Sequence, residues 1–246
     1  MASIVREYFD QVSDILERIS NDQTESLDAA ANAVADALKS GGLVYVAGSG
    51  HSHLIAAEAF FRAGGLAAVQ PIFDPSLMLH VSASRSSLVE RQTGSAARAL
   101  SNYDIKSVDV VFIVSNSGRN AFPVEAATIV KEIGATTIAI TSTRHTKAVS
   151  SRHPSGKRLF ELADIVIDNG ARYGDACLDI GPTGVAMGPT STISGCFIIN
   201  AVIAQAVDIL ASQSVPVDVY QSSNGEGGEE AVDAIVERWR PRIKGL

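Results

Sequence analysis

The sequence predicts an open, parallel α/β sandwich of three layers, and three observations lead to this fold class. Short β-branched runs alternate with segments whose apolar residues recur at helical spacing. The turns between these segments are short, which is typical of a parallel sheet with helices on both faces. Five predicted strands are too few for a closed eight-stranded barrel. We therefore expect one αβα sandwich.

Five short apolar runs predict the strands of the sheet. The second run contains Pro71, which has no N–H group to donate to a neighbouring strand, so we place it at a sheet edge. The third run, residues 110–114, consists only of valine, phenylalanine and isoleucine and is expected at the buried centre. The predicted strands cover residues 43–47, 67–72, 110–114, 136–140 and 164–167.

Two amphipathic helices are predicted before the first strand, and Gly41-Gly42 ends the second of them. We expect residues 1–40 to form an appended helical segment that packs on the core or on a second subunit. Residues 41–246 are expected to form the α/β domain. Gly134 is the predicted C-cap of one further helix. The later helices are predicted over residues 52–63, 122–133, 157–162, 190–212 and 229–238, and residues 75–102 are also helical in part.

Composition excludes several classes of protein. The net charge of −7 does not favour nucleic acid as a partner. The two cysteines, Cys177 and Cys196, have no CxxC spacing, which argues against a disulfide framework or a thiolate metal site and fits a reducing compartment. The start of the chain has no signal-peptide pattern. The longest apolar stretch, residues 195–211, contains three polar side chains and is slightly short for a bilayer, so we expect a buried helix and a soluble, cytoplasmic protein without a membrane partner.

A glycine- and serine-rich turn follows the first predicted strand. Residues 48–53 read Gly-Ser-Gly-His-Ser-His, and a helix follows. Small residues let backbone N–H groups approach an anion, and the helix N-terminus favours negative charge. The turn is neither a dinucleotide-binding GxGxxG motif nor a P-loop, because the third glycine and the lysine are missing. We expect Gly48, Ser49, Gly50 and Ser52 to bind phosphate, although a turn without a ligand is the alternative.

A second polar turn follows the third predicted strand and is the stronger signal. Residues 115–120 read Ser-Asn-Ser-Gly-Arg-Asn, with hydroxyl and amide donors beside a helix N-terminus. Ordinary turn formation explains the same residue types less well at the end of a buried strand. Both turns lie at the carboxyl edge of a parallel sheet, where ligands bind. The predicted ligand-binding residues of this turn and of the turn after the fourth strand are Ser115, Asn116, Ser117, Asn120, Thr141 and Ser142.

These turns, together with the run from Gly188 to Thr192 that opens an apolar helix, resemble the SIS (sugar isomerase) domain over nearly the whole chain. Within it the chain resembles a group of single-domain proteins close to phosphoheptose isomerase. The signatures of that group correspond to residues 50–53, 62–65, 115–120 and 152–158. The resemblance implies a flavodoxin-like five-stranded sheet and a site for a phosphorylated sugar. It also implies a homodimer or homotetramer with the site near a subunit interface.

The resemblance does not extend to the metal site of phosphoheptose isomerases. Those enzymes carry a histidine and a glutamate in the helix after the first turn, and a glutamine and a histidine in the last long helix. Here the last long helix has Gln205 and no histidine. We therefore predict no metal and no cofactor.

Aldose–ketose interconversion needs a base that moves a proton between adjacent carbons and a group that opens the sugar ring. Glu90 is the first candidate for the base, because related isomerases and etherases have a glutamate in this region. An exposed helical charge is the alternative. Glu58 is the second candidate, unless it forms a structural ion pair with Arg62. His53 leads the candidates for ring opening, ahead of His80 and His145.

Two charged segments have no assigned role. Residues 142–160 hold five cations and no acid, and they either cover an anionic ligand, reach a neighbouring subunit or form a solvated loop. Residues 222–230 are acidic and loop-like. The expected function is a phosphosugar isomerase that uses a glutamate base. A non-catalytic phosphosugar sensor and an amino-sugar-phosphate lyase or etherase are the alternatives.

Overall fold

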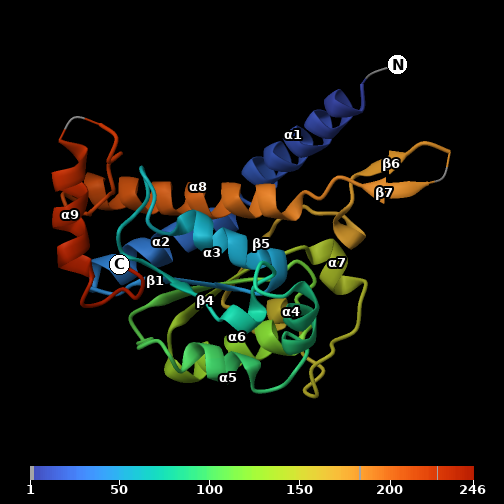
Figure 1. Cartoon of the computed structure of the whole chain (residues 1–246), viewed down its shortest axis with the longest axis horizontal. Helices are drawn as coiled ribbons and strands as arrows, with labels where there is room; N and C mark the ends of the chain where they lie inside the picture. Colours follow the sequence, from blue (N-terminus) through green and yellow to red (C-terminus); the bar gives the residue numbers. More distant parts are fainter. Residues whose placement is uncertain (1–2, 183, 226) are drawn as a thin grey trace.

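A parallel sheet of five strands in the order β2-β1-β3-β4-β5 forms the centre of the protein (Figure 1). The computed structural model describes residues 3–182, 184–225 and 227–246. All four strand pairs are parallel, with Val44 of β1 opposite Val69 of β2 and Val110 of β3. The strands are β1 (Val44–Gly48), β2 (Val69–Ile72), β3 (Val110–Val114), β4 (Thr136–Thr141) and β5 (Ile165–Asp168).

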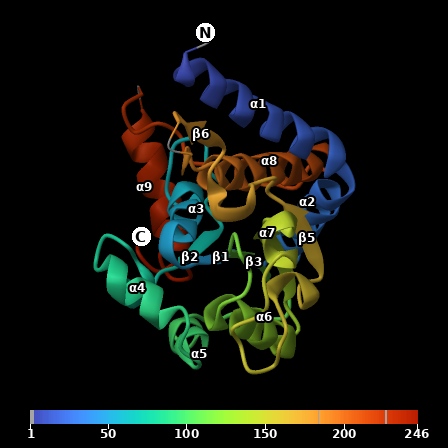
Figure 2. The ribbon, with the colours of Figure 1, turned by 90° about the vertical axis from the view of Figure 1, so that its right-hand side faces the viewer.

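Helices cover both faces of this sheet, which gives the three layers (Figures 1 and 2). One face carries α2 (Thr24–Lys39), α3 (His53–Ala59) and α8 (Ser191–Ser212), and α8 packs against both α2 and α3. The other face carries α4 (Ala83–Val89), α5 (Ser95–Leu100) and α6 (Ala121–Ile133). Because both faces are covered, every residue of β1 and β3 is buried.

The helices α1 (Ile4–Asp22) and α9 (Gly228–Trp239) and one hairpin lie outside the sandwich. The C-terminal half of α1 packs against α8, while the N-terminal half of α1 projects from the rest of the protein (Figure 1). A hairpin of β6 (Leu178–Ile180) and β7 (Val185–Met187) also projects. The helix α9 packs at the opposite end of α8. The short helix α7 (Thr143–Lys147) follows β4, and single 3-10 turns cover Gly50–Ser52, Pro75–Leu77, Leu159–Glu161 and Tyr173–Asp175.

The structure confirms the predicted fold class, the five parallel strands and the edge position of the strand that contains Pro71. Gly134 adopts φ 85° at the C-cap of α6, as expected of a glycine C-cap. The prediction was wrong about the helix after β1, which ends at Ala59 and not at residue 63. Phe60 is extended and packs on the core, and Phe61 has a left-handed φ of 42°, so the chain leaves the helix there. The β6–β7 hairpin was missed.

The helix α8 is long and apolar enough to cross a membrane by length and composition alone. In this fold it packs along α2 and α3, and Ile198, Ile199 and Val202 are fully buried. A core helix of a soluble protein passes the same test, so its composition is explained by packing in this helical layer.

Candidate functional site

Three polar turns lie side by side at the carboxyl edge of the sheet. They follow β1, β3 and β4, and β3 pairs with both of the other strands. The first turn requires glycine at position 48, because a Cβ there would lie 2.5 Å from the backbone oxygen of Ser52. Gly50 adopts a left-handed φ of 59°. The sheet therefore brings the turns together as the sequence predicts.

Glu90 joins the first two turns through its carboxylate. Ser49 Oγ donates to Glu90 Oε2 at 2.8 Å, and Asn120 Nδ2 donates to Glu90 Oε1 at 2.7 Å. The backbone oxygen of Glu90 accepts a hydrogen bond from Phe122 N at 3.0 Å. Ser49 and Asn120 are 8% and 7% exposed, so both donors are shielded from water. Glu90 is therefore fixed between the turns and does not point freely into solvent.

Burial raises the pKa of the Glu90 carboxyl, and the hydrogen bond from Ser49 and the charges of Arg91 and Arg152 oppose this shift. A carboxylate with a raised pKa is a stronger base than an exposed one. Burial therefore shifts Glu90 in the direction that favours general-base chemistry.

The second turn is held by Ser115 and by contacts with the turn that follows β4. Ser115 Oγ accepts a hydrogen bond from Gly118 N at 3.2 Å. The backbone oxygen of Asn116 accepts from Thr141 Oγ1 at 3.3 Å and from Ser142 N at 3.1 Å. Thr141 and Ser142 are fully buried, and Ser142 Oγ donates to the backbone of Ala171. These hydroxyls therefore serve the turn in this structure.

Ser52 and Ser117 are different, because neither hydroxyl has a hydrogen-bond partner among the described residues. Both side chains are half-buried, one in each of the first two turns. Gly118 follows Ser117 with a left-handed φ of 57°, and a Cβ there would press on Leu159 and Thr146 at 3.2 Å. Gly118 therefore keeps the second turn compact. The hydroxyls of Ser52 and Ser117 are left to donate to a ligand.

An arginine cluster lies around Glu90, and it was not among the predicted site residues. Arg152 Nη1 donates to Asn120 Oδ1 at 3.1 Å, which extends the chain of hydrogen bonds from Ser49 through Glu90. Arg119 Nε is buried without an acceptor among the described residues. Desolvation and the charges of Arg119 and Arg91 lower the pKa of Arg152. Arg91 and Arg152 thus act on the Glu90 carboxylate, and Arg119 lies close to Arg152, which favours an anionic ligand.

The signal for Arg152 was present in the sequence. The basic segment 142–160 was expected either to cover an anionic ligand, to reach a neighbouring subunit or to be solvated. The structure divides it, because Arg152 reaches the site while Arg158 is tied to Glu161 and to the backbone of Thr146 and Val149. Charge alone does not distinguish these two roles.

His53 lies at the start of α3, 5% exposed, with its Nδ1 bound to the backbone oxygen of Gly50. A carbonyl only accepts, so Nδ1 carries a proton, and Nε2 has no hydrogen-bond partner in the part of the chain that the structure describes. The ring lies 5.4 Å from the ring of His80. Glu58, farther along α3, forms an ion pair with Arg62 and accepts from Asn200 Nδ2 at 3.0 Å. Glu58 therefore has structural partners of its own.

The start of α8 is already occupied by a side chain. Asp175 accepts hydrogen bonds from the backbone N–H groups of Thr190 at 3.0 Å and Ser191 at 2.9 Å, and from both hydroxyls.

The ring centres of His145 and Tyr173 lie 4.8 Å apart, and burial together with the charge of Arg119 lowers the pKa of the His145 imidazole. Among the described residues no group of three His, Cys, Asp or Glu side chains is placed to hold a metal ion.

The chain is similar to proteins of one known family. Residues 7–142 match the SIS domain family. A UPF0309 protein of Geobacillus kaustophilus is 42% identical over 240 residues, covering 98% of this chain and 96% of its own. A UPF0309 protein of Halalkalibacterium halodurans is 41% identical over 239 residues, covering 97% of this chain and 99% of its own.

Among solved structures, phosphoheptose isomerase from Neisseria gonorrhoeae is 18% identical with a TM-score of 0.54, covering 83% of this chain and 97% of its own. The phosphoheptose isomerase from Francisella tularensis is 17% identical with a TM-score of 0.52, covering 85% of this chain and all of its own. At this identity the likeness concerns the fold. From the family match, the UPF0309 relatives and the shared sheet, we conclude that the chain belongs to the SIS domain family.

Proposed function

We propose that the protein is an isomerase that interconverts an aldose phosphate and a ketose phosphate, with Glu90 as the base. The observation that supports this most directly is the Glu90 carboxylate, fixed by Ser49 and Asn120 beside two spare serine hydroxyls. A raised pKa suits proton transfer at carbon. The arginines around Glu90 favour a substrate with negative charge.

The proposed mechanism uses residues from both turns. The phosphate binds Ser52 and Ser117 and the neighbouring backbone N–H groups. His53 Nε2 removes the proton of the anomeric hydroxyl, the bond between C1 and the ring oxygen breaks, and the imidazolium returns the proton to the ring oxygen. Glu90 then takes the C2 proton and returns it to C1, while the hydroxyl proton moves from O2 to O1 through an enediol. Atoms and charge balance, because the product is an isomer of the substrate.

The names of the structural neighbours support a sugar phosphate as ligand. The phosphoheptose isomerases from N. gonorrhoeae and F. tularensis act, by name, on a phosphorylated heptose, and both share the fold of this chain. The same site without a catalytic step would make the protein a phosphosugar sensor. A lyase or etherase acting on an amino-sugar phosphate would use the same glutamate differently. We retain isomerisation because Glu90, unlike Glu58, has no cation bound directly to it among the described residues.

The test has two stages. A thermal-shift panel of pentose, hexose, heptose and amino-sugar phosphates first identifies a ligand, and a panel without any response would exclude the phosphosugar proposal. Deuterium incorporation from solvent at C2 of that ligand then separates an isomerase from a sensor. We expect Glu90→Gln to abolish exchange and Ser117→Ala mainly to weaken binding. Ser107→Ala, at the opposite edge of the sheet, is the matched control. Full exchange in the Glu90 variant would move the base to Glu58.

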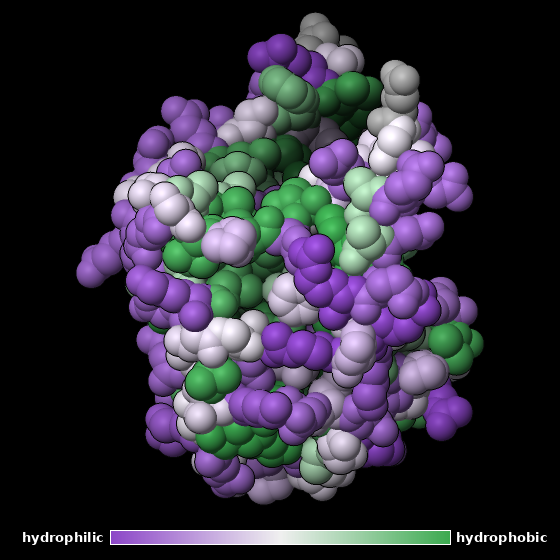
Figure 3. Space-filling model, turned by 90° about the vertical axis from the view of Figure 1, so that its left-hand side faces the viewer, coloured by the Kyte–Doolittle hydropathy of each residue, from purple (hydrophilic) through white to green (hydrophobic). Residues whose placement is uncertain are grey.

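We also propose a cytoplasmic homodimer or homotetramer. The projecting half of α1 exposes Val5 (75%) and Phe9 (57%), and β7 exposes Met187 (63%). On another face, shown in Figure 3, hydrophobic side chains gather around a hollow in the upper half of the molecule. Apolar surface of this kind supports contact with another subunit. Light scattering after size-exclusion chromatography tests this, and a monomeric mass would contradict it.

A further inference from the structure

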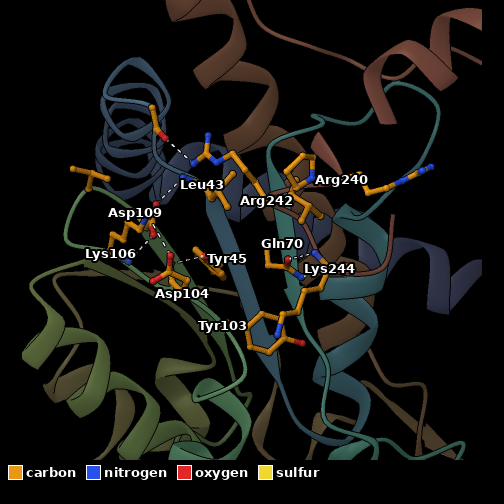
Figure 4. A pocket seen from close by; sticks show the side chains of 14 residues that line it. Leu43, Tyr45, Gln70, Tyr103, Asp104, Lys106, Asp109, Arg240, Arg242 and Lys244 are labelled. Atoms are coloured by element: carbon orange, nitrogen blue, oxygen red, sulfur yellow. Dashed lines mark hydrogen bonds and ion pairs between the residues drawn. The ribbon is translucent and has the colours of Figure 1, made fainter. Parts of the chain in front are cut away.

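A cavity lies at the opposite edge of the sheet from the turns after β1 and β3, which we call the serine-rich turns (Figure 4). Its walls come from residues at or just before the starts of β1 and β3, from the start of β2 and from the C-terminal segment 240–244. Leu43, Tyr45 and Gln70 form its floor beside the loop that holds Tyr103 and Asp104. Since β1 and β3 run from this edge to the candidate site, the cavity is separate from that site.

The C-terminal segment is fixed over this edge by hydrogen bonds. Gln70 Oε1 accepts from Lys244 N at 2.6 Å, and Arg242 Nη2 donates to the backbone oxygen of Gly41 at 2.8 Å. Ile243, between these two cations, is 2% exposed and packs in the core. Arg242 and Lys244 are therefore held at the cavity by the residue between them and by their own backbone or side-chain contacts.

The two carboxylates of the cavity have partners other than Arg242 and Lys244. Asp109 accepts from the backbone of Leu43 at 2.8 Å and of Lys106 at 2.7 Å, and it is 3% exposed. Asp104 pairs with the Lys106 ammonium at 3.3 Å. Among the residues that the structure describes, neither acid forms an ion pair with Arg242 or Lys244.

Arg242 and Lys244 have no carboxylate partner among the described residues. The Arg242 guanidinium lies 5.5 Å from the centre of the Trp239 ring, and the Lys244 ammonium lies 5.3 Å from that of Tyr103 and donates to a backbone carbonyl. An arginine has five N–H donors and a lysine has three, so both retain spare donors. Two cations without an ion pair thus lie at one cavity, which favours an anionic ligand.

The cavity is larger than a single inorganic anion requires. Its volume of about 410 Å³ lies in the range of small-molecule sites. Part of the lining is apolar and aromatic, including Leu43, Val108, Ile243 and the edge-to-face pair of Tyr45 and Tyr103. Such a lining accommodates an organic body beside the charged group. Arginine and lysine together are the usual protein ligands of phosphate.

We propose that this cavity binds a small organic phosphate, with Arg242 and Lys244 holding the phosphate group and the Tyr45–Tyr103 wall contacting the organic part. This ligand is distinct from the substrate of the candidate site, and the proposal does not depend on the proposed isomerase activity. It gives the protein a second small-molecule site, at the start of β1 and β3, the two strands whose carboxyl ends lead into the serine-rich turns.

The test uses adenosine 5′-monophosphate as the probe and isothermal titration calorimetry as the measurement. We expect the wild-type protein to bind it and the double variant Arg242→Gln/Lys244→Gln to bind at least 10-fold more weakly. Lys131→Gln, which removes an exposed cation from α6, is the matched control and should bind as the wild type does. Equal binding by all three proteins, or no binding by the wild type, would overturn the proposal.

Two further measurements locate the bound probe on the molecule. Ser117→Ala changes the candidate site and should leave binding of the probe unchanged. If this variant no longer bound the probe, the probe would lie at the carboxyl edge of the sheet and the proposal would be refuted. Adenosine without phosphate should not bind with comparable affinity. Because the double variant could misfold, acetylation of wild-type Lys244 is followed by mass spectrometry. The probe should protect Lys244 but not Lys131, and equal reactivity with and without probe would contradict the assignment.

Discussion

Replacing Glu90 by glutamine should change how the stability of the protein depends on pH. Burial raises the pKa of Glu90 in the folded protein, so the folded chain binds this proton more tightly than the unfolded chain does. The stabilisation from that proton is present below the unfolded pKa and is lost as the pH rises through the folded pKa. The wild-type protein therefore loses stability over a window that begins near the usual glutamate pKa and extends upward.

Glutamine has almost the same shape as glutamate and does not ionise. Its amide oxygen can still accept from Asn120, and Ser49 can turn its hydroxyl to accept from the amide nitrogen, so the contacts at 2.7 Å and 2.8 Å need not be lost. The variant and the wild type differ in their free energy of unfolding. The part of this difference that is the same at every pH reports the hydrogen bonds, and the part that changes with pH reports the ionisation of Glu90. We expect the free energy of unfolding of the variant, relative to wild type, to rise by on the order of 1 kcal/mol between about pH 4 and about pH 8.

Urea unfolding followed by circular dichroism at several pH values measures this difference. Glu132→Gln, the same substitution at an exposed position on α6, is the control and should give a smaller change with pH. Parallel stability curves for the Glu90 variant and wild type would refute the expected effect of burial. A difference that falls with rising pH would show that the arginines outweigh burial and lower the pKa of Glu90 below its usual value.

Three further changes have expected outcomes. Gly48→Ala places a Cβ 2.5 Å from the backbone oxygen of Ser52 and should lower the free energy of unfolding by about 1–3 kcal/mol, whereas an unchanged melting curve would contradict the close approach. Asp175→Ala removes the acceptor for the first N–H groups of α8 and should cost about 1–2 kcal/mol in urea unfolding; a stability equal to wild type would mean that water replaces the cap. Arg152→Gln should weaken binding of the identified sugar phosphate about 10-fold without a change in melting temperature. Unchanged affinity would remove Arg152 from the site.

The fold was largely predictable because its signals are local. Residues 110–114 are apolar throughout, as a strand buried on both faces must be, and the structure places them at the centre of the sheet. Pro71 marked the edge strand for a reason that depends on one missing N–H group. The end of α3 was not predictable in this way, since Phe60 leaves the helix to pack on the core. The β6–β7 hairpin has too few residues in each strand to give a periodic signal.

The candidate site was predictable only in part, because its contacts are not local. Sequence placed Glu90 near the site by resemblance, but its contact with Ser49 joins residues that are 41 positions apart. A hydroxyl at the end of a strand can face a ligand or close the turn, and residue type does not say which. Ser117 is without a partner among the described residues, while Ser142 is buried and bonded to the backbone. In the same way, Arg152 was one cation among several until the fold brought it to Asn120.

The capping of α8 by Asp175 has a consequence for how this chain can vary. Its hydrogen bonds to Thr190 and Ser191 join the two ends of the segment that contains the β6–β7 hairpin. Because both ends of this segment are held together, changes in its length need not disturb α8, which follows it. This makes the hairpin a module that can be lengthened, shortened or exchanged while the sheet and its serine-rich turns stay in place.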